Sequence, residues 1–221
     1  MRRLKTAGAA IAAILAFTAL LSAITASTAS ATLPEFLPGT AGTKFTGKSG
    51  VGTLEIAGSS TVECKEDKDE GVLLSSTEAL VTIEVLGCKV LDIVGAHSLG
   101  DPREVILYAG RSTESLCYIN KAKEEVGLAV HIPPGIHVEV AGTLIEMIGS
   151  IIGRITPFKK KILGPFQIAF KASEDKQEIT KCEGGPEESL LVSENGGSFK
   201  KAADILVTEG SAVSQEQELM E

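Results

Sequence analysis

The stretch Val126-Gly-Leu-Ala-Val-His-Ile-Pro-Pro-Gly-Ile-His-Val-Glu-Val140 decides the fold class of this 221-residue chain. Apolar residues alternate with other residues from Val126 to Ile132, and the series continues from Ile136 to Val140 beyond the Pro-Pro-Gly segment. Successive side chains of a β-strand point to opposite faces, so this spacing predicts strands with one apolar face. We interpret Pro133–Gly135 as a turn between two such strands.

The same alternation recurs along the rest of the chain, and turn residues separate the segments that carry it. Asn195-Gly-Gly197 is a strong hairpin signal. The alternating segments are Thr53–Ile56, Thr61–Lys65, Val81–Val85 and Phe166–Phe170, while Val105–Tyr108 and Ile205–Val207 are apolar throughout. Ten or more short strands of this kind predict an all-β domain, either a β-sandwich or a barrel-like structure.

Only Ser115–Val126 allows one short helix, because its apolar residues fall near helical spacing and Gly127 follows as a stop. A hairpin around Asn120–Lys123 is an equally good interpretation of the same residues.

The N-terminus has the pattern of a secretory signal peptide, expected to be a helix before cleavage. Arg2, Arg3 and Lys5 precede an uncharged apolar run, and Ala29-Ser-Ala31 provides small residues for a cleavage site. The strongly apolar part, Ala9–Leu21, is shorter than the roughly 20 residues of a membrane-spanning helix. We therefore expect export of the chain and no membrane span after cleavage.

These features predict a simple domain organisation. Residues 1–31 form the signal peptide, residues 32–43 an N-terminal arm, residues 44–211 a single β domain, and residues 212–221 a flexible acidic tail.

The mature chain is strongly acidic. Removal of the first 31 residues leaves 18 of the 21 basic residues and all 29 acidic ones, a net charge of about −11. Such a surface repels phosphate backbones, so we do not expect nucleic acid as a partner.

The cysteine count is even, which in an exported protein predicts disulfides. Four cysteines allow three pairings, and we favour Cys64–Cys88 and therefore Cys117–Cys182. Cys88 is out of phase with the strand before it, so the first pairing requires a bulge or a strand end near Gly87. Metal binding by these thiols is disfavoured because the chain has no Cys-x-x-Cys spacing.

The best candidate for a metal site is His131, His137 and Glu139. If Pro133–Gly135 is a turn, the two histidines lie nearly opposite each other on adjacent strands, with Glu139 on the same face. Two histidines and a carboxylate can bind catalytic zinc. Their face is expected to be the solvent face, however, and two surface histidines beside a turn are the simpler interpretation; His97 could join them only if its loop folds over.

The remaining candidates for chemistry are weaker. In Lys65–Gly71 the acidic residues resemble part of a calcium-binding loop, but the segment is short and contains two lysines, so we interpret it as a solvated hairpin tip. No Gly-x-Ser-x-Gly nucleophile motif and no phosphate-binding glycine loop occur, and we expect no cofactor.

Four segments of the mature chain together resemble a group of uncharacterised exported actinobacterial proteins. They are Leu33-Pro-Glu-Phe-Leu-Pro-Gly39, Phe45-Thr-Gly-Lys-Ser-Gly50, Tyr118-Ile-Asn-Lys-Ala-Lys123 and Glu183-Gly-Gly-Pro-Glu187. The resemblance implies an extracellular or cell-envelope β domain and carries no activity or site residue with it.

The sequence thus favours a secreted or envelope-associated, non-catalytic β domain that acts through its surface as a structural or binding module. One alternative is a small-ligand-binding barrel or sandwich, because a closed β structure can enclose a cavity. A less favoured alternative is a secreted metal-dependent hydrolase that uses His131, His137 and Glu139.

Overall fold

The structure is a computed structural model, which describes residues 33–37, 39–57, 61–100, 105–157, 161–163, 166–173 and 176–213. The predicted signal peptide and residues 214–221 lie outside the described residues. The elements are β1 (Glu35–Leu37), β2 (Lys44–Ser49), β3 (Gly52–Ile56), β4 (Val62–Cys64), β5 (Glu66–Leu73), β6 (Glu78–Leu86), β7 (Lys89–Val90), β8 (Val94–Ser98), β9 (Val105–Asn120), the 3₁₀-helix η1 (Lys121–Lys123), β10 (Glu125–Val140), β11 (Thr143–Thr156), β12 (Lys161–Leu163), β13 (Phe166–Phe170), β14 (Ala172–Ser173), β15 (Lys176–Gln177), β16 (Leu190–Glu194) and β17 (Lys200–Val213).

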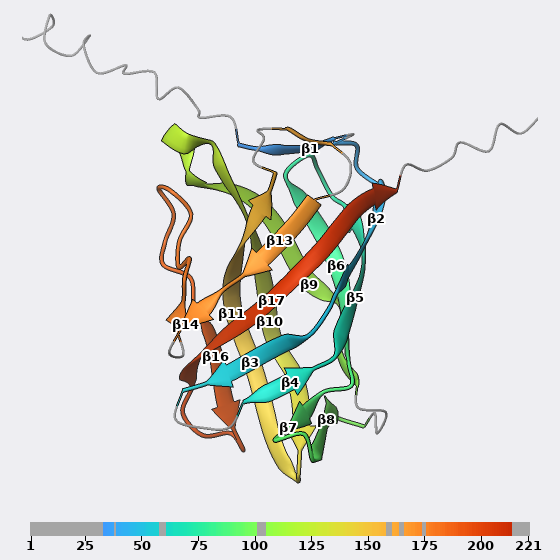
Figure 1. The fold of residues 1–221 in the computed structure, drawn as a ribbon, viewed down its shortest axis with the longest axis vertical. Coiled ribbons are helices and arrows are strands. Elements are labelled where there is room, and N and C mark those ends of the chain that lie inside the picture. The colour runs from blue at the N-terminus through green and yellow to red at the C-terminus, as the bar shows by residue number, and fades with distance from the viewer. Residues whose placement is uncertain are drawn as a thin grey trace, which may run out of the picture. The chain divides into compact units, whose positions relative to one another are not determined.

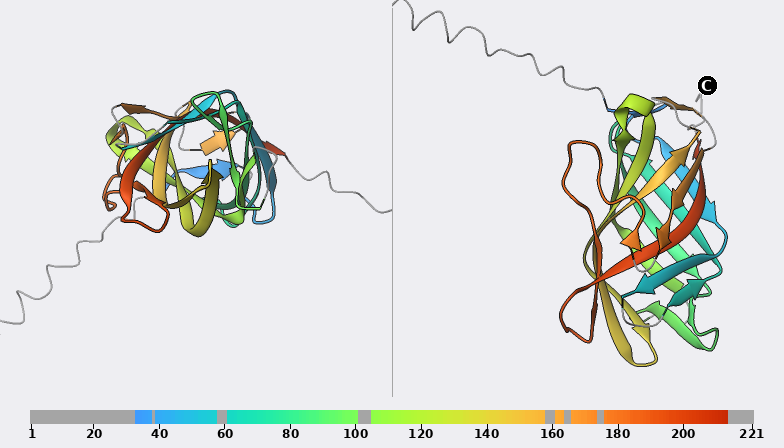
Figure 2. Two further views of the ribbon diagram at one scale, coloured as in Figure 1. Left: turned by 90° about the horizontal axis from the view of Figure 1, so that it is seen from below. Right: turned by 60° about the vertical axis from the view of Figure 1, so that its left-hand side comes forward.

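Thirteen of these strands form one sheet that closes on itself, which confirms the all-β prediction and selects the barrel over the sandwich (Figure 1). The pairings trace two closed rings stacked along the barrel. One ring is β10–β11–β13–β17–β2–β5–β6–β9, and the other is β10–β11–β16–β17–β3–β4–β7–β8. The view along the barrel shows the strands surrounding a common interior (Figure 2, left).

Strand β17 takes part in both rings because its two halves have different neighbours. Its first half pairs with β16 and β3, with Ala202 opposite both Leu190 and Ile56. Its second half pairs with β13 and β2, where Gly210 lies opposite Phe166 and Gly47. Strand β17 therefore connects the N-terminal strands β2 and β3 to the C-terminal strands β13 and β16.

Strand β10 corrects the expected turn at Pro133–Gly135. The strand runs without interruption past these residues, with a bulge between Ile132 and Ile136 in its pairing with β11. On its other edge β10 pairs with β9 up to His131 and with β8 from Val138 onward. Proline cannot donate a ladder hydrogen bond, and here the two prolines lie where the strand bulges and changes partner.

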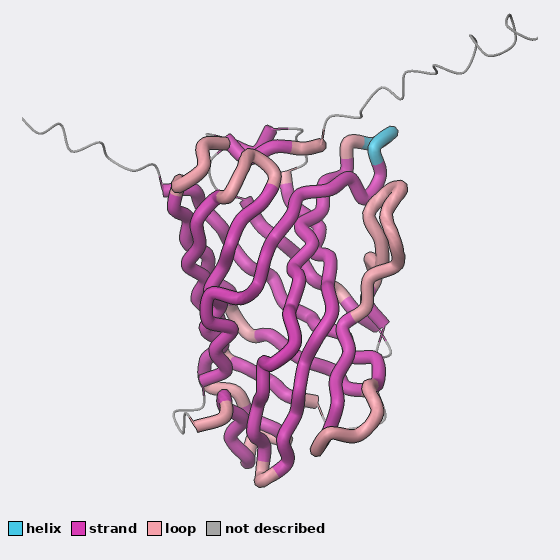
Figure 3. Tube along the Cα trace, turned by 180° about the vertical axis from the view of Figure 1, so that it is seen from behind, coloured by secondary structure: helices cyan, strands magenta, loops and turns pink. Residues whose placement is uncertain are grey.

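The helical interpretation of Ser115–Val126 is wrong, and the hairpin alternative is confirmed. Strands β9 and β10 pair directly, and η1 at the hairpin tip is only three residues long (Figure 3, cyan). The Asn120 side chain accepts a hydrogen bond from the Lys123 main-chain N–H at 3.2 Å. Because β9 also pairs with β6, strand pairing on both edges outweighs the local helical spacing.

The predicted N-terminal arm is partly a structural element of the domain. Glu35–Leu37 form β1, which pairs in parallel with β12 and crosses one end of the barrel (Figure 1). Phe36 is buried and packs against Phe166, with ring centroids 6.1 Å apart. At the other terminus β17 extends to Val213, so the strand includes the first residues assigned to the acidic tail. No helix among the described residues is long and apolar enough to cross a membrane.

Both predicted disulfides are present. Cys64–Cys88 connects the end of β4 to the segment after β6, which ends at Leu86 just before Gly87, as the phase of Cys88 requires. Cys117–Cys182 attaches the segment between β15 and β16 to β9. The same segment is held by a hydrogen bond of 2.6 Å from the Lys121 N–H to the Glu183 carboxylate.

Candidate functional site

The acidic segment predicted to be a solvated hairpin tip is instead a strand of the barrel wall. Glu66–Leu73 form β5, which pairs with β2 on one edge and β6 on the other. Glu66, Lys68 and Glu70 are exposed on the outer face, whereas Asp67 is only 2% exposed. The prediction failed because acidic residues occupy both faces of this strand, so no apolar alternation marks its inner face.

Three carboxylic acids line one cavity inside the barrel: Asp67 and Asp69 of β5 and Glu114 of β9. The cavity has a volume of about 110 Å³. The rest of its lining is mainly apolar and includes Ile83, Val85, Ile106, Val130, Met147 and Phe170. Among the described residues that line it, there is no Lys, Arg or His.

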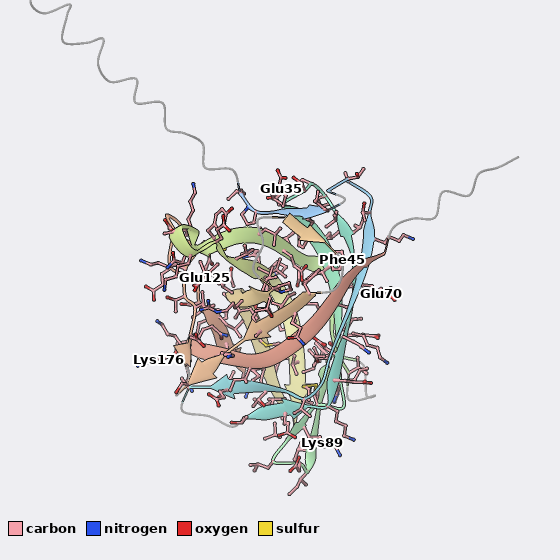
Figure 4. The ribbon with its side chains drawn as sticks, turned by 45° about the horizontal axis from the view of Figure 1, so that its top comes forward. Glu35, Phe45, Glu70, Lys89, Glu125 and Lys176 are labelled. Atoms are coloured by element: carbon pink, nitrogen blue, oxygen red, sulfur yellow. A yellow bond between two sulfur atoms is a disulfide. The ribbon has the colours of Figure 1, made fainter. Side chains whose placement is uncertain are left out.

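Small residues on β2 and β5 surround Asp69. Gly47 lies directly opposite Asp69 in the β2–β5 pairing, and Gly71 follows it on the same face. At Gly71 the Phe45 ring occupies the space of a side chain, since a Cβ atom there would lie 2.1 Å from Phe45 Cζ. Phe45, labelled in Figure 4, therefore packs over the β5 backbone beside the acidic residues.

Two of the three carboxyls, those of Asp69 and Glu114, have pKa values shifted toward the neutral form. Burial, with smaller contributions from the charges of Asp67 and Glu114, raises the pKa of Asp69 from 3.8 to about 8. Burial alone raises the pKa of Glu114 from 4.5 to about 7. Asp69 Oδ1 is buried without a hydrogen-bond partner among the described residues. Such shifted, convergent groups in a cavity are typical of functional sites.

A hydrogen bond between main chain and side chain fixes β5 beside the cavity. The Asp67 N–H donates to Ser49 Oγ at 2.9 Å, which connects β5 to the end of β2.

Strand β9 carries another buried polar group. Ser112 lies two residues before Glu114 and is completely buried, and its hydroxyl has no hydrogen-bond partner in the described part of the chain. The inner face of β9 near Glu114 therefore carries a buried hydroxyl that is available for a hydrogen bond.

A second cavity, of about 230 Å³, lies toward the end of the barrel formed by β7 and β8. Its lining is mostly apolar, with Glu194 as the one acidic side chain among the described lining residues. Val62 lines both cavities, so the two are neighbours along the barrel axis.

The predicted metal-site residues His131, His137 and Glu139 lie on one strand, β10, rather than on two facing strands. Their expected opposition was wrong because β10 does not turn at Pro133–Gly135. His131 Nδ1 contacts Ser150 Oγ of β11 at 2.9 Å, and His137 lies opposite Glu146 of β11. No group of three or more His, Cys, Asp or Glu side chains is placed to hold a metal ion within the described part of the chain.

Glu139 instead faces His97. We expected His97 to join the candidate metal site only if its loop folded over. Strand β8 brings His97 directly opposite Glu139, with His97 Nε2 and Glu139 Oε2 4.0 Å apart. The side chains are partly exposed, so this contact is a surface ion pair of little energetic weight when the histidine is protonated.

The sequence did contain a signal for the acidic cavity. Glu114 has the same strand phase as Leu116, which is buried, so alternation extended backwards from Leu116 turns Glu114 inward. The same extension from Leu73 turns Asp69 and Asp67 inward. What the sequence does not show is that these two strands face one interior.

The fold and the site together define a closed β-barrel with an acidic, mainly apolar internal cavity. No protein-family description matches the chain, and neither a curated protein nor a solved structure is significantly similar to it.

Proposed function

We propose that this chain is an exported, non-catalytic binding protein that holds a small ligand inside its barrel. The observation that carries the proposal is the internal cavity in which Asp69 and Glu114 meet an apolar lining. Burying a carboxyl without a partner destabilises a protein by about 1–3 kcal/mol or more. A barrel with a purely structural role gains nothing from the unpartnered Asp69 Oδ1 atom or from a second buried carboxyl, Glu114, whereas a ligand-binding barrel uses such groups to orient its ligand.

Three features support export. The N-terminal stretch has the order of a signal peptide, two disulfides are characteristic of oxidising compartments, and the resemblance points to exported proteins. We propose an extracellular or cell-envelope location on this basis.

Binding is favoured over covalent catalysis by the composition of the cavity. Thr53 is the only hydroxyl-bearing side chain among its described lining residues, and the sulfur of Cys64 is in a disulfide. The described lining residues include no Lys or His that could activate a nucleophile as a base.

The cavity volume limits the size of the ligand. About 110 Å³ is below the roughly 300 Å³ at which pockets for drug-sized ligands begin. An engineered aliphatic cavity of about 150 Å³ in another protein binds benzene. The ligand, or the part of it that enters, is therefore of about that size.

Benzene itself is a suitable probe for the proposal. We expect titration with benzene, followed by amide NMR shifts, to perturb residues around the cavity. The substitution Val85→Phe, which places a larger side chain in the cavity, should abolish these shifts. Glu84→Phe, on the opposite face of the same strand, is the matched control and should retain them. Absence of shifts in the wild type with benzene and with the smaller probes n-butanol and n-butylamine, or equal benzene shifts in both variants, would overturn the proposal.

A surface role has one specific observation in its favour. Leu91, Ile93 and Leu99 at the β7–β8 end are 77%, 82% and 60% exposed. Exposed apolar groups at one end of a domain favour contact with another molecule, of which a second copy is the simplest. Sedimentation of the wild type against a Leu91→Ser, Ile93→Ser variant tests this; a monomer in both cases would exclude self-association.

A further inference from the structure

The interior carboxyls of Asp69 and Glu114 have no positively charged partner among the described lining residues of the cavity. Glu114 is 7% exposed, lines the cavity, and its pKa is raised by burial with no compensating opposite charge. Asp69 lines the same cavity, and its Oδ1 atom is buried without a hydrogen-bond donor among the described residues. Asp69 Oδ1 can accept a hydrogen bond that no described residue donates, and the Glu114 carboxyl has no positively charged partner among the described lining residues.

A positive charge is the natural complement of such a site. Acidic side chains inside proteins are paired with cations or with hydrogen-bond donors, because an isolated buried charge is very unfavourable. The described lining residues include no Lys, Arg or His. A cationic ligand is therefore the remaining source of a positive charge that would favour the ionised form of these carboxyls.

The geometry favours an organic cation over a metal ion. A calcium ion needs six to eight oxygen ligands at 2.3–2.6 Å. Among the described residues no three His, Cys, Asp or Glu side chains are placed to hold a metal ion together, although three acids line the cavity. An ammonium group needs only two or three acceptors at hydrogen-bond distance, and its hydrocarbon part can contact the apolar lining.

We propose that the cavity binds a small aliphatic amine in its protonated form, with the ammonium group between Asp69 and Glu114 and the hydrocarbon body against Ile83, Val85 and Val130. The inference rests on the proposed ligand-binding function and specifies the chemistry of the ligand. The cavity volume of about 110 Å³ sets the size of the body at roughly four to six carbon atoms.

The test compares three probes of one size and different charge: n-butylamine, n-butanol and butyrate. We expect isothermal titration calorimetry near neutral pH to give butylamine an affinity at least tenfold higher than butanol, with butyrate the weakest. Glu114→Gln should lower the butylamine affinity at least tenfold and the butanol affinity far less, because only butylamine needs the negative charge. Glu70→Gln, on the outer face of β5, is the matched control and should change neither affinity.

Proton release gives a second measurement that needs no variant. A carboxyl that is protonated in the free protein must lose its proton to pair with an ammonium group. Titrations of the wild type in buffers of different ionisation enthalpy should therefore show proton release on butylamine binding and none on butanol binding. Binding of butylamine without proton release would contradict the proposal, even if a cavity variant fails to fold.

The outcomes separate this inference from the proposed function. If butanol and butylamine bind equally well in the wild type, the cationic ligand is excluded, while the ligand-binding barrel stands. If benzene, butanol and butylamine all fail to bind, the proposed function fails as well.

Discussion

Replacing Asp69 with Asn should make the protein more stable, and the gain should grow with pH. Asn has nearly the shape of Asp but cannot ionise. The pKa of Asp69 rises from 3.8 to about 8 on folding, so the folded protein holds its proton where the unfolded chain has lost it. The wild type is therefore at full stability below the unfolded-state pKa and loses stability as the pH rises toward the folded-state pKa. The Asp69→Asn variant has no such loss, because its amide side chain carries no titrating proton.

The size of the effect follows from the distance between pH and pKa. At about pH 4, close to the unfolded-state pKa of 3.8, the loss of stability has only begun, so the variant should gain less than about 1 kcal/mol. At about pH 6, roughly two units above 3.8, the wild type is destabilised by about 3 kcal/mol at 1.36 kcal/mol per unit. Glu114, whose pKa is also raised, adds a smaller penalty in the same direction and should respond likewise to Gln.

Urea unfolding followed by far-ultraviolet circular dichroism at these two pH values, with the disulfides intact, measures the difference directly. Glu70→Gln is the control, because Glu70 is exposed on the other face of β5 and its removal should change stability by no more than about 0.5 kcal/mol. An Asp69→Asn variant that is no more stable than the wild type at about pH 6 would contradict the raised pKa of Asp69. A gain that is equal at both pH values would contradict it too, because burial of an ionisable group requires a pH-dependent gain.

Three further predictions concern the barrel itself. Removing the Cys64–Cys88 link by a double Ser substitution should lower the free energy of unfolding by about 3 kcal/mol, measured by urea unfolding, and an unchanged midpoint would argue against a structural role. Gly149→Ala should destabilise by about 3 kcal/mol, because φ is +106° and the new Cβ would lie 2.1 Å from the Ser189 carbonyl oxygen; Gly50→Ala, with open space around it, should have little effect. Phe36→Ala should cost about 3 kcal/mol in the same assay if β1 is part of the packed domain, and a negligible loss would restore the interpretation of this segment as an arm.

The sequence predicted the class of the fold because period-two alternation is a local property. The apolar series from Val126 to Ile132 and from Val81 to Val85 are strands in the structure, and Asn195–Gly197 is the predicted turn between β16 and β17. Cysteine spacing predicted both disulfides. Closure into a barrel was beyond such reasoning, because it depends on pairings such as β17 with β2 that join opposite ends of the chain.

The candidate site was harder to predict for two physical reasons. First, Pro133 and Pro134 are typical of a turn, yet the sheet tolerates them where β10 exchanges β9 for β8. Because the chain does not turn there, His131 and His137 lie on one strand and not on two facing strands. Second, Asp67 and Asp69 lie on the inner face of β5 against the usual rule that buried positions are apolar. Departures from that rule occur at functional sites, so a pattern of apolar residues is least able to identify buried positions there.

The double role of β17 also determines when the barrel can form. Neither ring is complete without this strand, so β2 and β3 have unpaired edges until the C-terminal part of the chain is available. If the chain crosses a membrane N-terminus first, closure must wait until translocation is nearly complete. The exported intermediate would then present open strand edges, which are prone to pair with other chains, and a prematurely terminated chain would keep them.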